Sequence, residues 1–337
     1  MKITALIPIL EHAAVVRQQV LIVGAPGIGK TQITEQVARR KGLDLITLHP
    51  AIAEPTDFRG FPWLVQENGE ASARFVAFEQ LAAMMAADQP TLVFIDDLGQ
   101  ASEGVQKALM QLIWGRKIAG KAMSDQVFFW GATNDTTHDA GVQRLLAPVK
   151  GRFHTILHAE PDLPSWEAWA MGARMPPSLI AFIRARPQLL HQFEATVEIK
   201  NSPSPRTVAM MGEIERAGYA ETALPELFTG AAGKGVATEY LAFRKLHLEM
   251  IDPATALAAP ERFPVPDAAQ VDKLYMLAVG VGQMAEAGNF EQVIAVAGRL
   301  PDEYAALMIH AARRVAPEVE NTAAWTRWIT GKGGELV

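Results

Sequence analysis

The stretch Leu21–Thr31 reads LIVGAPGIGKT and has the residue types that bind the phosphates of a nucleotide. It fits the pattern G-x-x-x-x-G-K-[ST], with glycines at 24 and 29 followed by Lys30 and Thr31. Glycines let the backbone wrap so that successive N–H groups and the next helix N-terminus meet phosphate oxygens. We expect Lys30 to reach the β and γ phosphates and Thr31 to hold Mg²⁺. A ligand-free turn explains the glycines but leaves Lys30 and Thr31 as coincidence. The predicted nucleotide-binding residues are Gly24, Ala25, Pro26, Gly27, Ile28, Gly29, Lys30 and Thr31.

Two carboxylates, Asp96 and Asp97, follow the apolar run Thr91–Ile95. A continuous apolar strand belongs in a parallel sheet covered on both faces, and such sheets bind ligands at the carboxyl ends of their strands. Both aspartates are therefore expected beside the phosphate-binding loop. Asp96 would bind Mg²⁺ through water, and Asp97 would orient or deprotonate the attacking water. A helix cap is the alternative role for one of them, although two uncompensated carboxylates facing a cleft are costly without a cation.

Two more polar residues stand where a phosphate site would use them. The buried strand predicted at 126–132 is followed closely by Asn134, so an amide reaches the same edge of the sheet. A turn-forming asparagine is the alternative. Arg206 falls in the first turn of a helix predicted at 204–217, where a positive charge opposes the helix dipole. This placement favours a nearby anion, with an ordinary surface arginine as the alternative.

The elements expected to position these residues alternate between strands and helices. The residue pattern predicts strands at 20–23, 45–48, 91–95, 126–132 and 153–158, and helices at 3–19, 31–41, 78–87 and 101–114. This order predicts a doubly wound parallel-sheet α/β domain. Two hairpins are expected, one at 65–78 through Glu67-Asn68-Gly69 and one at 115–121. From residue 161 onward only helices are expected.

Composition narrows the classes of function. The chain has 337 residues, of which 49% are hydrophobic, so it can bury the cores of about two domains. Its net charge of −6 disfavours nucleic acid as a partner. With no cysteine, disulfides, thiolate zinc sites and cysteine nucleophiles are excluded, which fits a reducing compartment and a cytoplasmic location. The apolar start at 3–10 is interrupted by Pro8, so we expect neither a signal peptide nor a membrane span.

These motifs resemble those of the MoxR branch of the AAA+ ATPases. GAPGIGKT at 24–31 is similar to the Walker A motif, and LVFIDD at 92–97 to the Walker B motif. By the same resemblance, Asn134 matches the sensor-1 asparagine. Arg152 in APVKGRF matches the arginine finger, with Arg144 as a competing candidate. Arg206 in SPSPRTV matches the sensor-2 arginine.

The resemblance implies a ring, expected to be a hexamer, in which Arg152 of one subunit completes the ATP site of the next. It also implies three parts: an AAA+ core at 1–160, a helical lid at 161–235 and a helical C-terminal extension at 236–337. Segments 56–78 and 115–126 look like the inserts of this family that commonly face the pore. The catalytic residues expected from the motifs are Asp97, Asn134, Arg152 and Arg206, and the metal ligands are Thr31 and Asp96.

One departure bears on the activity. Similar proteins usually carry glutamate after the Walker B aspartate, and here it is Asp97, which is shorter by one methylene. Our main hypothesis is an ATP-driven remodelling or assembly chaperone of a partner protein, which the resemblance links to von Willebrand A-type domains. The second is a nucleotide-gated scaffold with marginal hydrolysis, which Asp97 favours and Arg152 opposes. The third, a motor on nucleic acid, is disfavoured by the net charge.

Overall fold

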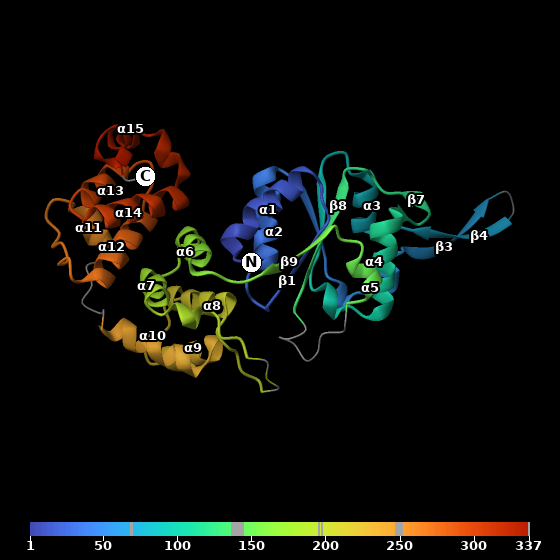
Figure 1. Ribbon diagram of the computed structural model, residues 1–337, viewed down its shortest axis with the longest axis horizontal. Coiled ribbons are helices and arrows are strands. Elements are labelled where there is room, and N and C mark those ends of the chain that lie inside the picture. Colours follow the sequence, from blue (N-terminus) through green and yellow to red (C-terminus); the bar gives the residue numbers. More distant parts are fainter. Residues whose placement is uncertain (68–69, 136–144, 195, 197, 247–251, 336–337) are drawn as a thin grey trace. The chain divides into compact units, whose positions relative to one another are not determined.

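The computed structural model describes residues 1–67, 70–135, 145–194, 196, 198–246 and 252–335. The chain divides into two compact units (Figure 1). The sheet unit comprises Met1–Pro161 with Phe193–Ala195, and the helical unit comprises Asp162–Gln192 with Thr196–Val337. The division into 1–160, 161–235 and 236–337 stays a prediction.

A five-stranded parallel sheet forms the centre of the sheet unit (Figure 1). Its strands, in chain order, are β1 (Val20–Gly24), β2 (Asp44–Leu48), β5 (Thr91–Ile95), β8 (Val127–Thr133) and β9 (Thr155–Ala159). In space they run β2-β5-β8-β1-β9. All neighbours pair in parallel, so Val20 at the start of β1 lies opposite Trp130 of β8 and Thr155 of β9. The strand pattern predicted from the sequence is therefore confirmed.

Helices cover both faces of this sheet because its central strands are apolar throughout. Successive residues of a strand point to opposite faces; accordingly Leu21 and Ile22 belong to two different hydrophobic clusters. One face packs against α1 (Ile3–Val15) and α2 (Lys30–Lys41). The other packs against α3 (Glu79–Ala86), α4 (Glu103–Gly115) and α5 (Ala147–Lys150). This layering is the doubly wound α/β arrangement predicted from the sequence.

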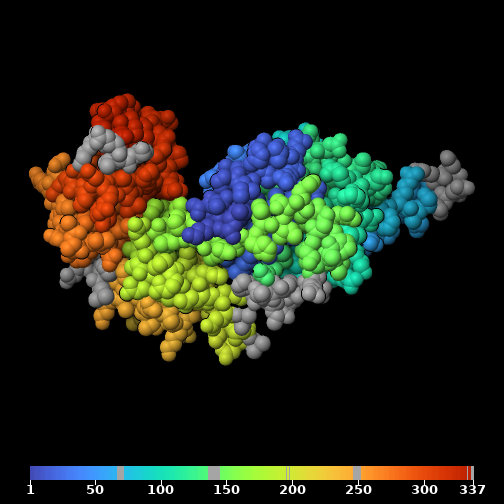
Figure 2. Space-filling model, in the orientation of Figure 1, coloured from blue at the N-terminus to red at the C-terminus, as the bar shows by residue number. Residues whose placement is uncertain are grey.

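Two hairpins extend from the sheet unit. The longer one pairs β3 (Phe61–Glu67) with β4 (Glu70–Val76) in antiparallel register, which confirms the predicted hairpin, although turn residues 68–69 lie outside the described part. It projects from the body of its unit (Figure 2). The shorter one pairs β6 (Lys117–Ile118) with β7 (Lys121–Ala122). The loop from β2 to β3 holds short 3₁₀ turns at Pro50–Ile52 and Pro55–Phe58.

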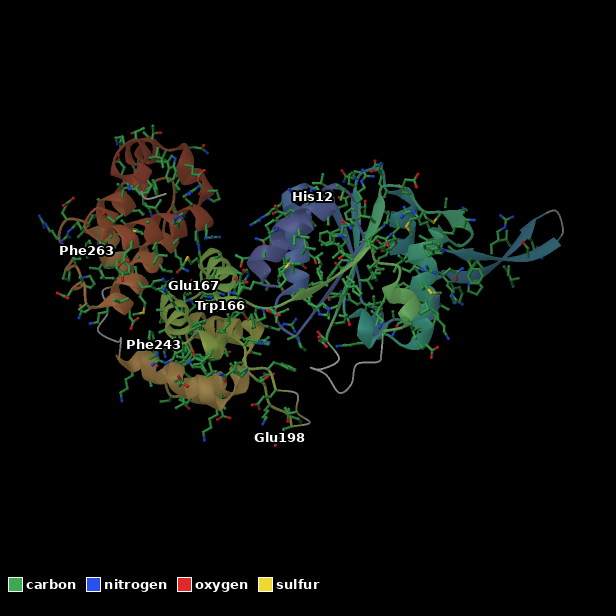
Figure 3. All side chains as sticks on the ribbon, in the orientation of Figure 1. His12, Trp166, Glu167, Glu198, Phe243 and Phe263 are labelled. Carbon is green, nitrogen blue, oxygen red and sulfur yellow. The ribbon has the colours of Figure 1, made fainter. Side chains whose placement is uncertain are left out.

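All regular elements in the described part of the helical unit are helices, as predicted for the chain from residue 161 onward, and one of them covers most of the helix predicted at 204–217. Its helices are α6 (Leu163–Gly172), α7 (Pro177–Ala185), α8 (Pro205–Arg216), α9 (Leu224–Ala232), α10 (Lys234–Leu246), α11 (Pro253–Ala258), α12 (Val271–Gln283), α13 (Phe290–Ala297), α14 (Asp302–Val315) and α15 (Ala323–Thr330). Several begin with proline, whose fixed φ suits the first helical turn. Trp166 and Glu167 lie next to each other on α6 (Figure 3). None of the helices in the described ranges is long and apolar enough to cross a membrane.

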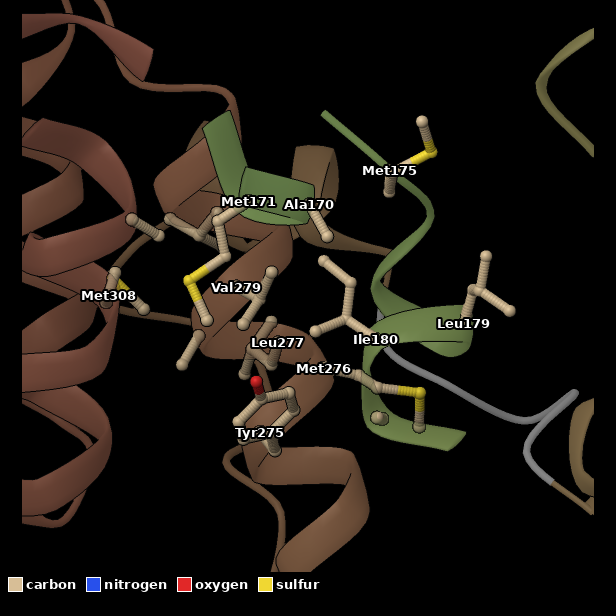
Figure 4. Packing of buried hydrophobic residues seen from close by; sticks show 14 of the residues in the cluster. Ala170, Met171, Met175, Leu179, Ile180, Tyr275, Met276, Leu277, Val279 and Met308 are labelled. Carbon is tan, nitrogen blue, oxygen red and sulfur yellow. The ribbon is translucent and has the colours of Figure 1, made fainter. Parts of the chain in front are cut away.

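One hydrophobic cluster holds the helical unit together. Figure 4 shows Met171 of α6, Ile180 of α7 and Leu277 of α12 meeting in its interior. Met308 of α14 packs into the same cluster. The cluster includes residues from Trp166 of α6 to Ala324 of α15, so helices far apart in the chain share one core.

Candidate nucleotide-binding site

The predicted phosphate-binding loop connects β1 to α2. Gly27 (φ 74°) and Gly29 (φ 97°) have left-handed backbone conformations. Glycine adopts such a conformation freely, whereas a residue with a side chain is strained in it. Gly29 is the N-cap of α2 and has no side chain with which to occupy the first N–H groups of that helix. These N–H groups and the positive end of the helix dipole suit an anion such as phosphate.

Lys30 is buried within this loop, with 7% of its surface exposed. Its Nζ donates hydrogen bonds to the carbonyl oxygens of Gly24 and Ala25, both at 3.0 Å, and to Asn134 Oδ1 at 2.8 Å. A buried charge of this kind is tolerated because its donors are paired. The fold thus brings Lys30 and Asn134 together, because β1 and β8 are neighbours and both end at this edge.

Thr31 and Asp96 also meet at this edge. The Thr31 hydroxyl donates to Asp96 Oδ2 at 2.8 Å, and the backbone N–H of Asp97 donates to Asp96 Oδ1 at 3.0 Å. Both carboxylate oxygens are therefore held in place. Hydroxyl and carboxylate oxygens are ligands that Mg²⁺ accepts, so this pair fits the predicted metal site. A bound Mg²⁺ there would neutralise charge on the β and γ phosphates.

Asp97 has a left-handed backbone conformation, with φ 51° and ψ 38°. It stands at the N-cap of a short 3₁₀ turn, Leu98–Gln100, but its side chain makes no capping hydrogen bond. The helix-cap alternative is therefore not the role that this geometry gives it. Aspartate and asparagine adopt the left-handed conformation more readily than larger residues do. The backbone thus gives a physical reason for aspartate where the similar family usually has glutamate.

Arg152 lies at the opposite edge of the sheet from these residues. It stands between α5 and β9, and Thr155 at the start of β9 pairs with Val20 at the start of β1. The phosphate-binding loop follows the other end of β1. At roughly 3.3 Å per residue, this strand alone spans about 13 Å. The structure therefore does not bring Arg152 together with Lys30 of the same chain.

The Arg152 side chain stacks on an exposed aromatic ring. Its Cζ lies 4.1 Å from the ring centroid of Trp114 in the last turn of α4, and 69% of the Trp114 surface is exposed. Among the described residues, the buried Arg152 Nε has no hydrogen-bond acceptor. A cation over an indole face is worth about 0.5–1 kcal/mol at an exposed site and about 2 or more when desolvated.

Sequence reasoning missed Trp114. The buried positions of α4 follow helical spacing and include Val105, Leu109 and Leu112. Trp114 lies outside this apolar stripe, and a tryptophan in such a position was the signal by which the sequence could have identified it.

The two other predicted arginines are placed differently. Arg206 is exposed in the first turn of α8, as predicted, and belongs to the helical unit. The N-terminus of α8 is capped by Ser204, whose Oγ accepts a hydrogen bond from the Thr207 N–H at 3.2 Å. Arg144 lies outside the described residues, so the choice between Arg152 and Arg144 as the finger stays a prediction.

Comparisons with known proteins found a family match over part of the chain. Residues 20–161 match the family model "ATPase family associated with various cellular activities (AAA)". No curated protein sequence matches the chain. The Thermotoga maritima RuvB Holliday junction branch migration motor is 16% identical, with a TM-score of 0.39, and the alignment covers 83% of this chain and 80% of that one. NtrX from Brucella abortus, in complex with ADP, is 12% identical with a TM-score of 0.41, over 97% of this chain and 67% of that one.

At identities below 25% and TM-scores below 0.5, neither likeness bears on what this chain binds or does. The match to the family model, unlike these two structural similarities, bears on the chain itself. It includes every strand of the central sheet and every predicted site residue except Arg206. Residues 20–161 therefore carry an AAA ATPase family domain.

Proposed function

We propose that the chain is an ATP-binding and hydrolysing, MoxR-like AAA+ protein that works as a ring and remodels or assembles a partner protein. The observation that carries this proposal is the division of the site. At one edge of the sheet Lys30 contacts Asn134 and Thr31 contacts Asp96, whereas Arg152 lies at the opposite edge. If Arg152 is the arginine of this site, a second copy of the chain must supply it.

Each residue of the site has a role in this reaction. Lys30 and the loop N–H groups bind the β and γ phosphates. Thr31 and Asp96 hold Mg²⁺. Asp97 orients the attacking water and accepts its proton, and Asn134 positions Lys30 and the transferring phosphoryl group. An arginine supplied in trans stabilises charge in the transition state and is worth roughly 10³ to 10⁵ in rate.

The long hairpin β3–β4 supports a protein as the partner. It carries large apolar side chains that are exposed, namely Phe61, Trp63, Leu64, Phe75 and Val76. Exposed apolar surface of this kind is typical of protein contacts. The resemblance to MoxR proteins extends this to a client with a von Willebrand A-type domain, to a hexameric ring, and to Arg206 as the link between hydrolysis and the helical lid. The net charge of −6 supports a protein over nucleic acid.

A subunit-mixing experiment tests the proposal. Lys30→Ala should lose ATP binding, whereas Arg152→Ala should keep ATP binding and lose most hydrolysis. Mixing the two variants should restore part of the activity, because some interfaces then pair an intact loop with an intact arginine. Arg39→Ala, which removes an exposed arginine from the last turn of α2, is the control and should hydrolyse ATP at the parent rate.

Absence of recovery in preparations that demonstrably exchange subunits would refute trans catalysis. Recovery with Arg144→Ala instead of Arg152→Ala would move the finger to Arg144 and keep the ring.

A nucleotide-gated scaffold is the second candidate, and Asp97 is the observation that favours it. Its carboxylate is one methylene shorter than glutamate, and misplacing a catalytic group by about 1 Å can cost on the order of 10²-fold in rate. A steady-state ATPase assay, with and without DNA, separates the candidates. Turnover at background with intact ATP binding and ATP-dependent assembly supports the scaffold, and stimulation by DNA supports a nucleic-acid motor.

A further inference from the structure

The pair formed by Arg152 and Trp114 sits on anchored elements. Arg116, the C-cap of α4, donates from its guanidinium to the carbonyl oxygens of Ser124 at 2.7 Å and Val127 at 3.1 Å. These bonds fix the end of α4 against the start of β8. Trp114, two residues earlier, is therefore held at the edge of the sheet where the strands begin.

Arg152 is anchored from its own side. The backbone N–H of Leu146, just before α5, donates to the buried Gln106 Oε1 of α4 at 2.9 Å. Phe153, next to Arg152, is buried and packs over Gly131 of β8. Both partners of the stacked pair are thus held by hydrogen bonds and core packing, which keeps the guanidinium in one place.

An aromatic face holds a guanidinium differently from a carboxylate. A carboxylate would take up the N–H donors and cancel the charge, whereas a ring attracts the cation through its π electrons and leaves the in-plane donors unused. Among the described residues, no carboxylate is ion-paired with Arg152, and its Nε has no acceptor. Among the described residues, the guanidinium is therefore oriented without a neutralising carboxylate, which leaves its charge for an anion from outside the chain.

We propose that Trp114 is a positioning residue that holds Arg152 for a phosphate group bound by a second copy of this chain. This inference rests on the proposed function, in which that phosphate belongs to the neighbour's nucleotide. Trp114 does not touch the reacting atoms. It limits the orientations of the Arg152 guanidinium and so raises the fraction of interfaces with the arginine in place.

The experiment compares Trp114→Ala, Trp114→Phe and Trp114→Leu in the full chain, with turnover and ATP affinity measured separately. We expect Trp114→Ala and Trp114→Leu to lower kcat roughly 10- to 100-fold with ATP affinity unchanged, because a guanidinium displaced by about 1 Å has an effect of this order. Trp114→Phe keeps an aromatic face and should retain most of the activity. Val15→Ala removes an exposed apolar side chain at the end of α1 and is the matched control. Thermal unfolding of every variant separates misfolding from a loss of positioning.

Two further experiments test whether Trp114 acts through Arg152. On an Arg152→Ala background, Trp114→Ala should cause no additional loss, because the ring acts through the arginine. Mixed with Lys30→Ala, Trp114→Ala should recover activity as Arg152→Ala does, because the defect lies on the arginine side of the interface.

The outcomes separate this inference from the function on which it rests. Arg152→Ala at the parent rate would overturn both the finger and the role of Trp114. If Arg152→Ala is slow but Trp114→Ala or Trp114→Leu hydrolyses ATP at the parent rate, only the role of Trp114 is overturned. The same holds if the two losses of activity multiply when Arg152→Ala and Trp114→Ala are combined.

Discussion

Asp97 combines an unusual backbone conformation with the position expected of the catalytic base. Its φ of 51° is left-handed, and its N–H is bound to Asp96 Oδ1. Backbone strain at a non-glycine residue persists where the surrounding structure enforces it, and such residues cluster at functional sites. We expect this turn to redirect the side chain and so to offset the shorter reach of aspartate.

We predict that Asp97→Asn folds normally, keeps ATP affinity and loses hydrolysis by about 10²- to 10⁴-fold, the usual contribution of a general base. Asparagine has the same shape and tolerates the left-handed conformation, so the change removes only the charge. Asp97→Glu should also be slower than the parent, because the longer side chain overreaches from this backbone. Single-turnover ATP hydrolysis checks both. Asp97→Asn at a parent rate that exceeds background would exclude Asp97 as the base.

The contact between Thr31 and Asp96 leads to a prediction about Mg²⁺. Without Mg²⁺, Thr31→Ala and Asp96→Asn should bind nucleotide as the parent does. Both should lose the gain in affinity that Mg²⁺ brings, because Thr31→Ala removes the hydroxyl and Asp96→Asn removes the negative charge of the carboxylate. Thr31→Ser keeps the hydroxyl and should keep the gain. Calorimetric titrations with and without Mg²⁺ measure the difference. An unchanged Mg²⁺ effect in both Thr31→Ala and Asp96→Asn would place the metal elsewhere.

Among the elements, the close approach of α12 to α14 depends on Gly282. A Cβ added at Gly282 of α12 would lie 2.5 Å from the Met308 carbonyl oxygen of α14. Gly230 of α9 has nothing within 4 Å of the same built atom. We predict that Gly282→Ala lowers the free energy of unfolding by about 1–3 kcal/mol through overpacking. The control Gly230→Ala should raise it by about 0.5–1 kcal/mol, because alanine suits an open helical position better. Denaturant unfolding compares the two, and equal effects would contradict the packing argument.

A second element-level prediction concerns Glu167 of α6. Burial raises the pKa of its carboxyl group, with the nearby Arg184 guanidinium opposing the shift. In the window from the ordinary glutamate pKa up to this raised pKa, the unfolded chain loses its proton first and the folded chain keeps it. The contribution of Glu167 to stability is therefore present below that window and lost as the pH rises through it.

Glu167→Gln should remove this part of the pH dependence of the free energy of unfolding. Glu221 is the control with the opposite sign, because hydrogen bonds from Arg244 lower its pKa. The stability that Glu221 contributes is present above the ordinary pKa and lost as the pH falls through the lowered one. Urea unfolding across the acidic pH range compares Glu167→Gln and the control Glu221→Gln with the parent. An unchanged slope in Glu167→Gln would contradict the burial argument.

At the scale of the whole molecule, the predicted site residues of the sheet unit lie at two edges of one sheet. If Arg152 acts on the site of a neighbour, turnover per chain must depend on assembly. We predict that turnover per chain falls when the parent is diluted, whereas Arg152→Ala stays low at every concentration. Sedimentation under the assay conditions shows where the assembly dissociates. Constant turnover of the parent below that concentration would show that a single chain is sufficient.

The sequence by itself determined the phosphate-binding loop, the central strands and the acidic pair at the end of β5. These features depend on residues adjacent in the chain. The glycines at 27 and 29 meet a local need for left-handed backbone, and an apolar run such as Thr91–Ile95 is buried in any parallel sheet. The hairpin formed by β3 and β4 was predictable for the same reason, because the sequence Asn68-Gly69 is typical of tight turns between paired strands.

Only the tertiary structure decided which distant residues meet. The contact of Lys30 with Asn134 requires β8 to lie beside β1, and no local pattern specifies that order. The opposite edge occupied by Arg152, and its stacking on Trp114, follow from the parallel pairing of β9 with β1 and from the packing of α4. The left-handed turn at Asp97 was also hidden, because a backbone conformation enforced by its surroundings leaves no signature in the residue type alone.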